Sequence, residues 1–373
     1  MHLLAYPGVD SLPASYAELL ECGARHDVRW SRSWLDAVMG HRASIDDAPL
    51  LFGVENSAGR PRAVAAALSS VRYSKDLYAR ALILAQGDDT PYRPLVADGV
   101  SPLEILRMVA HHARRCDPAY DVLRVSPLDT DTDAELFQRL PSALRGEGWI
   151  PQRFLMFANW YEHVSGLGSD EFLRGRPSRL RSTVERRARS LLRSGRSRIE
   201  VIRGGPALDT SISDYELVFT RSWKRGLGEV SVNHLHAIIR VAAQAGALRL
   251  ALLYVDNVPA AAQLWLINAG VAHLYRLAYD GRFRELSPGT VLTWHVVKEM
   301  LDVEKVQELD LGIGDDAYKA DWVSGRRERW GILGFNPRTW GGLKAAGRNI
   351  GGRAAKHVVQ VLLHPLAARS SGG

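Results

Sequence analysis

The stretch that decides the fold runs from Leu248 to Trp322 and reads LRLALLYVDNVPAAAQLWLINAGVAHLYRLAYDGRFRELSPGTVLTWHVVKEMLDVEKVQELDLGIGDDAYKADW. It opens with three apolar runs, at residues 248–254, 260–267 and 271–279. The connections between them contain the turn formers Asp256, Asn257 and Gly270. Short apolar runs bounded by Asn, Asp and Gly are typical of β-strands joined by tight turns. The stretch therefore predicts three consecutive strands.

A helix and a short strand follow the three runs. Ser287 and Pro288 are typical of an N-cap and a first helical position. The apolar residues after them recur at helical spacing, at Val291, Trp294, Val297 and Leu301. Residues 309–311 then predict a strand that ends in Gly312-Ile313-Gly314. Strands that lead into a helix with small residues at its N-terminus predict a site that accepts an anion.

The order and spacing of these segments resemble the GNAT acyltransferase superfamily, and in particular its CelD-like branch, which is related to the FemAB peptidyltransferases. The residues that carry the resemblance are Pro259-Ala260-Ala261, 275–280, Ser287-Pro288-Gly289, 310–314, Tyr318-Lys319 and Trp322. The resemblance covers the last half of the chain well and the first half loosely. It implies an α/β (α+β) fold of two tandem GNAT-like domains, each with a mixed central β-sheet flanked by helices.

An internal repeat also predicts two copies of one α/β unit. At an offset of 186 residues, Ser101-Pro102 corresponds to Ser287-Pro288, and Leu123 corresponds to Leu309. Matches that keep one offset through a helix and a strand favour a duplicated unit. The predicted organisation is an N-terminal GNAT-like domain at residues 1–160, a C-terminal GNAT-like domain at residues 161–340 and a basic tail at residues 341–373.

The two copies differ where the chemistry is expected. The same offset places Arg124 opposite Asp310, and Asp133 opposite Lys319. Only the second copy therefore combines a glycine-flanked carboxylate with the pair Tyr318-Lys319. We predict that the C-terminal domain is catalytic, and that the N-terminal domain is a degenerate partner that helps to form the acceptor groove.

The composition is that of an ordinary globular protein, with 46% hydrophobic and 24% charged residues. Its 373 residues are enough for two domains. Cys22 and Cys116 lie far apart in the sequence, which is typical of reduced thiols in a cytoplasmic protein. The N-terminus does not read as a signal peptide, and no apolar run approaches the ~20 residues of a membrane span. We therefore expect a cytoplasmic protein.

The net charge of +7 is unevenly distributed. Residues 171–203 hold eleven Arg against three Glu, a local charge of +8, and residues 338–373 hold six Lys or Arg and no acid. The rest of the chain therefore carries −7. This pattern argues against a protein that coats nucleic acid, and favours two local surfaces that face anions.

Both basic segments contain a predicted amphipathic helix. In residues 177–194, an apolar stripe surrounded by Arg is formed by Leu180, Val184, Ala188 and Leu191. This helix is either a solvated helix packed by its stripe or a phosphate-binding face, since guanidinium groups bind phosphate oxygens bidentately. The second helix, at residues 354–363, could contact an acidic membrane at its inner face or pack on its own domain.

The family resemblance implies an acyl-CoA donor, such as acetyl-CoA. In that family the strand before the helix and the helix N-terminus hold the pantetheine and pyrophosphate groups. Carried over to this sequence, the cofactor-binding residues are Tyr275, Leu277, Tyr279, Ser287, Gly289 and Thr290. The segment LSPGT at residues 286–290 departs from the pattern, because it has fewer glycines and basic residues than the usual GNAT phosphate loop.

Acyl transfer needs a group that takes a proton from the acceptor, a polarised carbonyl and two substrates held together. We predict Asp310 as the general base, because it lies at a strand end beside glycines. Lys319 is the candidate for polarising the carbonyl or binding a donor phosphate, and Tyr318 for protonating the leaving group. The alternatives are a turn carboxylate for Asp310 and a surface position for Lys319.

The candidate substrate-binding residues are Asp280, Asp315, Arg276 and Trp322. Asp280 and Asp315 are also the second choices for the base. Strand alternation predicts that Tyr275 and Arg276 point to opposite faces, so that only one of them reaches a cleft. For Trp322, a position in the core is the alternative. No His, Cys or carboxylate set has the spacing of metal ligands, so we expect no metal.

The predicted function is transfer of an acyl group from acyl-CoA to an amine or hydroxyl of a sugar, cell-envelope precursor or metabolite. A FemAB-like transferase that uses aminoacyl-tRNA is the alternative within the same fold, and its tRNA would meet the basic helix. A non-catalytic binding protein and a nucleic-acid-binding module are further alternatives. The second of these lacks the interleaved aromatic residues that such modules use.

Overall fold

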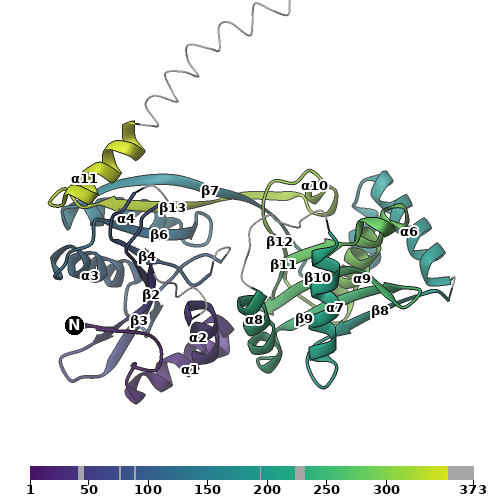
Figure 1. The fold of residues 1–373 in the computed structure, drawn as a ribbon, viewed down its shortest axis with the longest axis horizontal. Coiled ribbons are helices and arrows are strands. Elements are labelled where there is room, and N and C mark those ends of the chain that lie inside the picture. Colours follow the sequence, from purple (N-terminus) through teal and green to yellow (C-terminus); the bar gives the residue numbers. More distant parts are fainter. Residues whose placement is uncertain (41–45, 75–76, 88–89, 194, 223–231, 352–373) are drawn as a thin grey trace, which may run out of the picture. The chain divides into compact units, whose positions relative to one another are not determined.

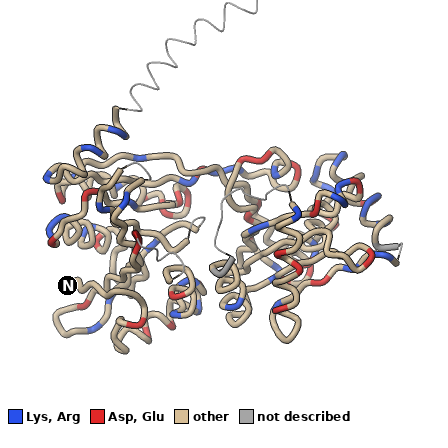
Figure 2. Tube along the Cα trace, viewed as in Figure 1, with Lys and Arg blue, Asp and Glu red and all other residues tan. Residues whose placement is uncertain are grey.

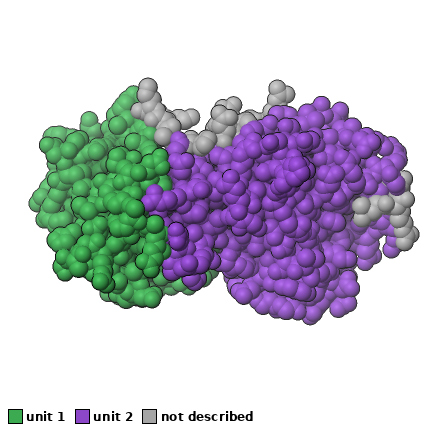
Figure 3. Space-filling view, turned by 90° about the horizontal axis from the view of Figure 1, so that it is seen from below, with its two compact units in different colours: residues 1–19, 42–156, 329–373 green, residues 20–41, 157–328 purple. Residues whose placement is uncertain are grey.

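The computed structural model describes residues 1–40, 46–74, 77–87, 90–193, 195–222 and 232–351 (Figure 1). The chain divides into two compact units (Figure 3). Unit 1 comprises residues 1–19, 42–156 and 329–373, and unit 2 comprises residues 20–41 and 157–328. Each unit is built on its own mixed set of strands flanked by helices.

Unit 2 contains residues 248–322, from which the strands and the helix were predicted. Its strands follow the order β7–β12–β11–β10–β9–β8. They are residues 157–163 of β7 (Ile150–His163), β8 (Ser197–Ile202), β9 (Leu248–Val255), β10 (Val258–Asn268), β11 (Val271–Tyr279) and β12 (Glu308–Ile313). All neighbours are antiparallel except β11 and β12, which are parallel. The predicted strands at 248–254, 260–267, 271–279 and 309–311 are thus confirmed.

Helices cover both faces of this sheet. One face carries α5 (Ser169–Arg174), α6 (Ser178–Arg193) and α9 (Pro288–Asp302), and the other carries α7 (Leu208–Thr220), α8 (Val232–Gln244) and α2 (Arg32–Gly40). The α9 face is a core built around Trp265 and Leu274, with Val291 and Val297 from α9 itself. The apolar spacing read from the sequence after Pro288 therefore forms the buried side of a helix.

Residues 20–41 lie with unit 2 because polar contacts fix them there. Asn268, at the end of β10, accepts a hydrogen bond from the Val28 backbone at 3.0 Å and donates to Asp27 Oδ1 at 2.8 Å. Asp27 is also held by Arg29, in the short helix η2 (Val28–Trp30) that follows α1 (Ala17–His26). The contact between α2 and α8 then buries Trp34 and Val38.

Unit 1 repeats the topology of unit 2. Its strands follow the order β1–β2–β3–β4–β6–β13, and only β4 and β6 are parallel. They are β1 (His2–Tyr6), β2 (Asp47–Glu55), β3 (Pro61–Ser70), β4 (Ala81–Leu84), β6 (Val122–Asp129) and residues 329–335 of β13 (Gly325–Phe335), with β5 (Leu95–Val96) beside β3. Its helices are α3 (Pro102–Arg115), α4 (Ala134–Gly146) and α11 (Trp340–Ala346). The prediction of two tandem α/β units, each with a mixed sheet flanked by helices, is thus confirmed.

Two of the four points at which the chain passes between the units lie inside strands. β7 begins in unit 1 and its second half completes the unit 2 sheet, whereas β13 begins in unit 2 and completes the unit 1 sheet. These two points lie near residues 157 and 329. The linear division at residues 160 and 340 remains a prediction from the sequence. The predicted tail helix at residues 354–363 lies outside the described residues. Within the described ranges, no helix combines the length and the apolar character needed to span a bilayer.

Two tryptophans offer a test of the core of unit 2. Trp265 is fully buried in the α9 face, whereas Trp340 at the start of α11 is 80% exposed. We expect Trp265→Ala to lower the free energy of unfolding by about 3–5 kcal/mol, because it leaves a cavity, and Trp340→Ala to change it by less than about 0.5 kcal/mol. Urea unfolding followed by circular dichroism measures both. Equal losses would contradict the assignment of the core.

Candidate active site

The parallel pair β11 and β12 opens after only three residue pairs. Val271, Ala272 and His273 face Glu308, Leu309 and Asp310, and the two strands then have different partners. β11 continues along β10 as far as Tyr279, whereas Ile313 of β12 pairs with Asn159 of β7. Gly312 has φ +69°, and a Cβ added there would lie 2.6 Å from the Leu274 carbonyl oxygen. Glycine thus permits the bend at which the strands diverge.

A β-bulge in β11 changes which side chains share a face. The register with β10 shifts between Leu264 and Trp265, and Tyr275 is the extra residue. Tyr275 packs against the core on the α7 and α8 face, and the Arg276 guanidinium lies 5.8 Å from the ring centre of Phe219 in that same core. The predicted alternation of Tyr275 and Arg276 is therefore wrong, because a bulge places two consecutive residues on one face.

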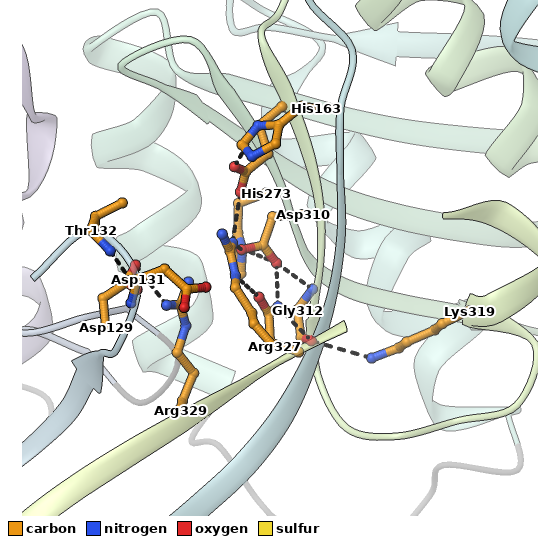
Figure 4. A network of polar contacts seen from close by, with 12 residues as sticks. Asp129, Asp131, Thr132, His163, His273, Asp310, Gly312, Lys319, Arg327 and Arg329 are labelled. Atoms are coloured by element: carbon orange, nitrogen blue, oxygen red, sulfur yellow. Dashed lines mark hydrogen bonds and ion pairs between the residues drawn. The ribbon is translucent and has the colours of Figure 1, made fainter. Parts of the chain in front are cut away.

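Asp310 lies buried at the point of divergence and is surrounded by donors (Figure 4). Its Oδ1 accepts from Asn159 Nδ2 and from the Gly312 backbone, both at 2.7 Å. Arg327 Nη2 approaches its Oδ2 at 2.8 Å, and His273 Nδ1 approaches Oδ1 at 3.2 Å. Four chain segments thus meet at a single carboxylate.

Arg327 connects this carboxylate to a second one. Its Nη2 also lies 2.6 Å from Glu308 Oε1, its Nε donates to Asn159 Oδ1, and its guanidinium lies over the ring of Tyr161 at 4.1 Å. Glu308 in turn approaches His163 at 3.4 Å. His163 is 74% exposed and His273 only 18% exposed, so the two imidazoles of the network differ in their access to water.

The environment of Asp310 sets its protonation state. Burial by itself would raise the pKa of Asp310, but the charges of His273 and Arg327 and the hydrogen bond from Asn159 hold it well below its usual range. A carboxylate with such a low pKa is a weak base. Its contacts instead orient the His273 ring and stabilise an imidazolium if that ring takes up a proton.

Lys319 holds the glycine-rich turn that follows β12. Its buried Nζ donates to the carbonyl oxygens of Ile313 at 2.6 Å, Gly314 at 3.3 Å and Gly312 at 3.4 Å. Asp310 and Lys319 thus both contact Gly312 in this turn (Figure 4). Asp310 accepts from the Gly312 N–H, and Lys319 donates to the Gly312 carbonyl oxygen. The neighbouring Tyr318 is 39% exposed, and the desolvation of its buried part and the Asp316 carboxylate raise its pKa.

Three other predicted residues have structural partners. Asp280 is buried, pairs with Arg282 at 2.6 Å and caps the short helix η3 (Gly281–Leu286), and these bonds lower its pKa. Asp315 accepts from Arg326 and Trp160, which lower its pKa to about 2. Trp322, in α10 (Lys319–Trp322), is buried in the core on the α9 face.

The start of α9 carries the predicted phosphate site. Ser287 adopts a left-handed conformation with φ 52°, and Pro288 is the first helical residue. A Cβ added at Gly289 would lie 3.5 Å from the Tyr279 ring, so Gly289 and Tyr279 are neighbours. The backbone N–H groups of Gly289 and Thr290 fall in the first helical turn, where no intrahelical acceptor is available. This end of α9 can therefore receive an anion.

The basic helix predicted from the sequence is α6. Leu180, Val184 and Leu191 are buried in the core beneath it, as predicted. A shallow depression of about 850 Å³ follows its outer side and is lined by Arg179, Arg186, Arg189, Ser182, Thr183, Glu185 and Ser190. Arg positions recur along the trace of this helix (Figure 2). The spacing of Arg179, Arg186 and Arg189 places the three guanidinium groups on one helical face.

The sequence reasoning missed most of the Asp310 network. His273, Arg327, Asn159 and Glu308 were not selected, although His273 and Arg327 are polar residues inside strands. A polar residue within a strand is a weak signal of function, because the alternation of polar and apolar residues predicts only that it faces solvent. Within the part of the chain that the structure describes, no group of three or more His, Cys, Asp or Glu side chains is placed to hold a metal ion.

Comparisons with known proteins bear on the same region. The family model for the acetyltransferase (GNAT) domain matches residues 178–320. No curated protein matches the sequence. The crystal structure of FemX is similar with a TM-score of 0.58 at 13% identity, covering 89% of this chain and 97% of FemX. The structure of L-PGS from Bacillus licheniformis has a TM-score of 0.51 at 11% identity, covering 90% of this chain and 96% of L-PGS.

The charge state of Asp310 yields a pH-dependent prediction. Because its pKa is lowered on folding, Asp310 stabilises the fold above its unfolded pKa of about 4, and this contribution is lost as the pH falls towards the folded-state value. We expect Asp310→Asn to cost about 3–5 kcal/mol at pH 7, since it leaves Arg327 without one partner, and to cost less at pH 3.

Urea unfolding at pH 7, 5 and 3 measures this difference. Asp170→Asn is the matched control, because that carboxylate is exposed on α5 and should change the unfolding free energy little at any of these pH values. A penalty for Asp310→Asn that stays constant down to pH 3 would contradict the assignment of a buried, ionised carboxylate.

Proposed function

From this GNAT-superfamily, FemAB-related fold, we propose that the protein is an acyltransferase that moves an acyl group from acyl-CoA to an amine or hydroxyl. The acceptor class we propose is a sugar, a cell-envelope precursor or a metabolite. The observation that carries the proposal is the divergence of β11 and β12 at His273 and Asp310. This divergence lies inside the segment that matches the acetyltransferase domain.

The donor would lie along β11 and reach the start of α9. Its phosphate groups would meet the backbone N–H groups of Gly289 and Thr290, where the helix dipole favours negative charge. Its pantetheine arm would follow the part of β11 beyond His273, where β12 no longer pairs with it. Leu277 and Tyr279 line the α9 face of that segment. Acetyl-CoA is the simplest donor of this class.

His273 replaces Asp310 as our candidate base. As the acceptor nitrogen or oxygen attacks the thioester carbonyl, the imidazole would take its proton, and the Asp310 carboxylate would stabilise the imidazolium. The carbon–sulfur bond then breaks, and CoA leaves as a thiolate. Tyr318, whose phenol is protonated at neutral pH, is the candidate donor of the proton that this thiolate takes up. Lys319 then acts as a positioning residue, through the turn after β12.

Donor binding is tested at the start of α9. We expect acetyl-CoA and longer acyl-CoAs at 100 times their Kd to stabilise the folded protein by about 2.7 kcal/mol, visible as a higher melting temperature. Gly289→Val should abolish this shift, because the added side chain occupies the space next to Tyr279. Gly168→Val, at the start of α5, is the matched control and should keep the shift. A shift that survives Gly289→Val would contradict the donor site.

The base is tested with the two histidines of the network. We expect His273→Gln to lower kcat by about 10²–10⁴-fold with little change in the KM for acyl-CoA. His163→Gln alters the exposed imidazole of the same network and should leave kcat nearly unchanged. Equal activity of His273→Gln and the wild-type protein would overturn this assignment.

The α6 depression favours a second candidate, a transferase that uses aminoacyl-tRNA. Three arginines on one helical face match the charge and the geometry of a phosphodiester backbone. This candidate replaces the first if no acyl-CoA raises the melting temperature of the wild-type protein while charged tRNA does so in a salt-dependent manner. Absence of both responses would favour a non-catalytic binding protein.

A further inference from the structure

The helix that ends the described chain exposes apolar side chains. Trp340, Leu343 and Ile350, from α11 and the π-helical turn that follows it (Gly347–Gly351), are 80%, 43% and 45% exposed. Trp340 and Leu343 lie three residues apart and therefore on the same side of the helix. We call Trp340, Leu343 and Ile350, with the neighbouring Lys344 and Arg348, the α11 face. Exposed apolar side chains that gather into one patch with a polar rim mark an interaction site.

The α11 face is presented by a fixed helix and not by a loose end. The opposite side of α11 buries Ala345 and Ala346 against Phe335 and Leu333 of β13. Thr339 caps the helix by accepting from the Gly342 backbone at 3.1 Å. The closeness of Gly342 to the Asn336 backbone leaves no room for a Cβ there. The helix therefore has an inner side that is packed and an outer side that is apolar.

The π-helical turn is also tied to unit 1. Tyr73 donates from its hydroxyl to Asn349 at 3.3 Å, and Asn349 donates to the Ala345 carbonyl at 2.8 Å. Arg348 donates to Ser74 at 3.5 Å, which anchors one edge of the turn. The exposed position of Ile350 thus belongs to an ordered segment.

The charged side chains on the helix that carries the α11 face are all positive. Lys344 and Arg348 come from the helix itself, Arg338 precedes it, and residues 338–373 contain no Asp or Glu. One carboxylate, Asp121, lies beside Gly341 and accepts a hydrogen bond from the Arg80 backbone N–H at 2.7 Å. A basic rim around apolar side chains is complementary to a surface that combines anions with hydrocarbon.

We propose that the α11 face binds the surface of a bilayer that contains anionic phospholipids. Tryptophan prefers the headgroup level, because its ring is apolar and its N–H needs a polar partner. Leu343 and Ile350 would reach the acyl boundary, and Lys344 and Arg348 would meet lipid phosphates. Contact of this kind is peripheral, because α11 is far shorter than a membrane span.

Two other partners fit the same face less well. A nucleic-acid backbone would match Lys344 and Arg348, but it offers nothing for Leu343 and Ile350. A second copy of the chain would cover the apolar residues, but two α11 faces would bring the same basic side chains together, and like charges repel. The proposal concerns location and does not depend on which acyl donor the protein uses.

Cosedimentation with vesicles tests the proposal on the full chain. We expect binding to vesicles of one-third phosphatidylglycerol in phosphatidylcholine, weakened by added salt, and much weaker binding to phosphatidylcholine alone. Trp340→Ala should lower the partition coefficient about tenfold. Lys344→Gln and Arg348→Gln should each lower it roughly fivefold on anionic vesicles only.

The matched control is Val303→Ser, which alters an exposed apolar residue in unit 2 and should leave vesicle binding unchanged. Circular dichroism and the melting temperature would show that each variant is folded. The proposal is overturned by three results: no vesicle binding, binding that Trp340→Ala and Leu343→Ser leave intact, or a dimer in solution that Trp340→Ala dissociates. Acyl-CoA binding measured on the same variants reports the transfer site separately.

Discussion

The buried Asp310 carboxylate is the point on which unit 2 depends. It joins β12 to β11 through His273, to β7 through Asn159 and to β13 through Arg327. A carboxylate removed from water must be compensated by donors from every side, and here these come from four separate segments of the chain. The strands can therefore diverge beyond Asp310 without the sheet coming apart, because charge and hydrogen bonds hold them where the ladder ends.

The sequence could predict the elements but not this junction. Val291, Val297 and Leu301 identify α9 by their spacing, and the turn at Asp256 and Asn257 separates β9 from β10 with positive φ at both residues. The partners of Asp310, in contrast, are selected by tertiary packing, since Asn159 lies 151 residues away from it in the chain. Likewise, the bulge at Tyr275 depends on pairing with β10, so a period-2 reading of β11 alone places Arg276 on the wrong face.

Contacts with residues outside the motif also explain why the roles we propose for Asp310 and Lys319 differ from those predicted from the sequence. A carboxylate beside glycines looks like an accessible base, but its accessibility depends on Arg327, a residue outside the motif. Lys319 looks like a substrate ligand, but its Nζ is directed at the backbone carbonyls of 312–314. In unit 1 the residue at the position of Asp310 is Arg124, whose burial lowers its pKa and whose Nε donates to Ser126 at 2.8 Å. The two units thus share a backbone topology, but their side chains at this position carry opposite charges.

The crossing of the chain inside β7 and β13 has a consequence for synthesis. Unit 1 takes its first strands from the N-terminus and its last strand from residues 329–335. During translation, which proceeds from the N-terminus, the sheet of unit 1 therefore lacks an edge until most of the chain has been made. Unit 2, whose strands lie between residues 157 and 313, has all its strands earlier. Unit 1 is therefore synthesised first but completed last. Until β13 has been synthesised, β6 is an unpaired edge of the unit 1 sheet.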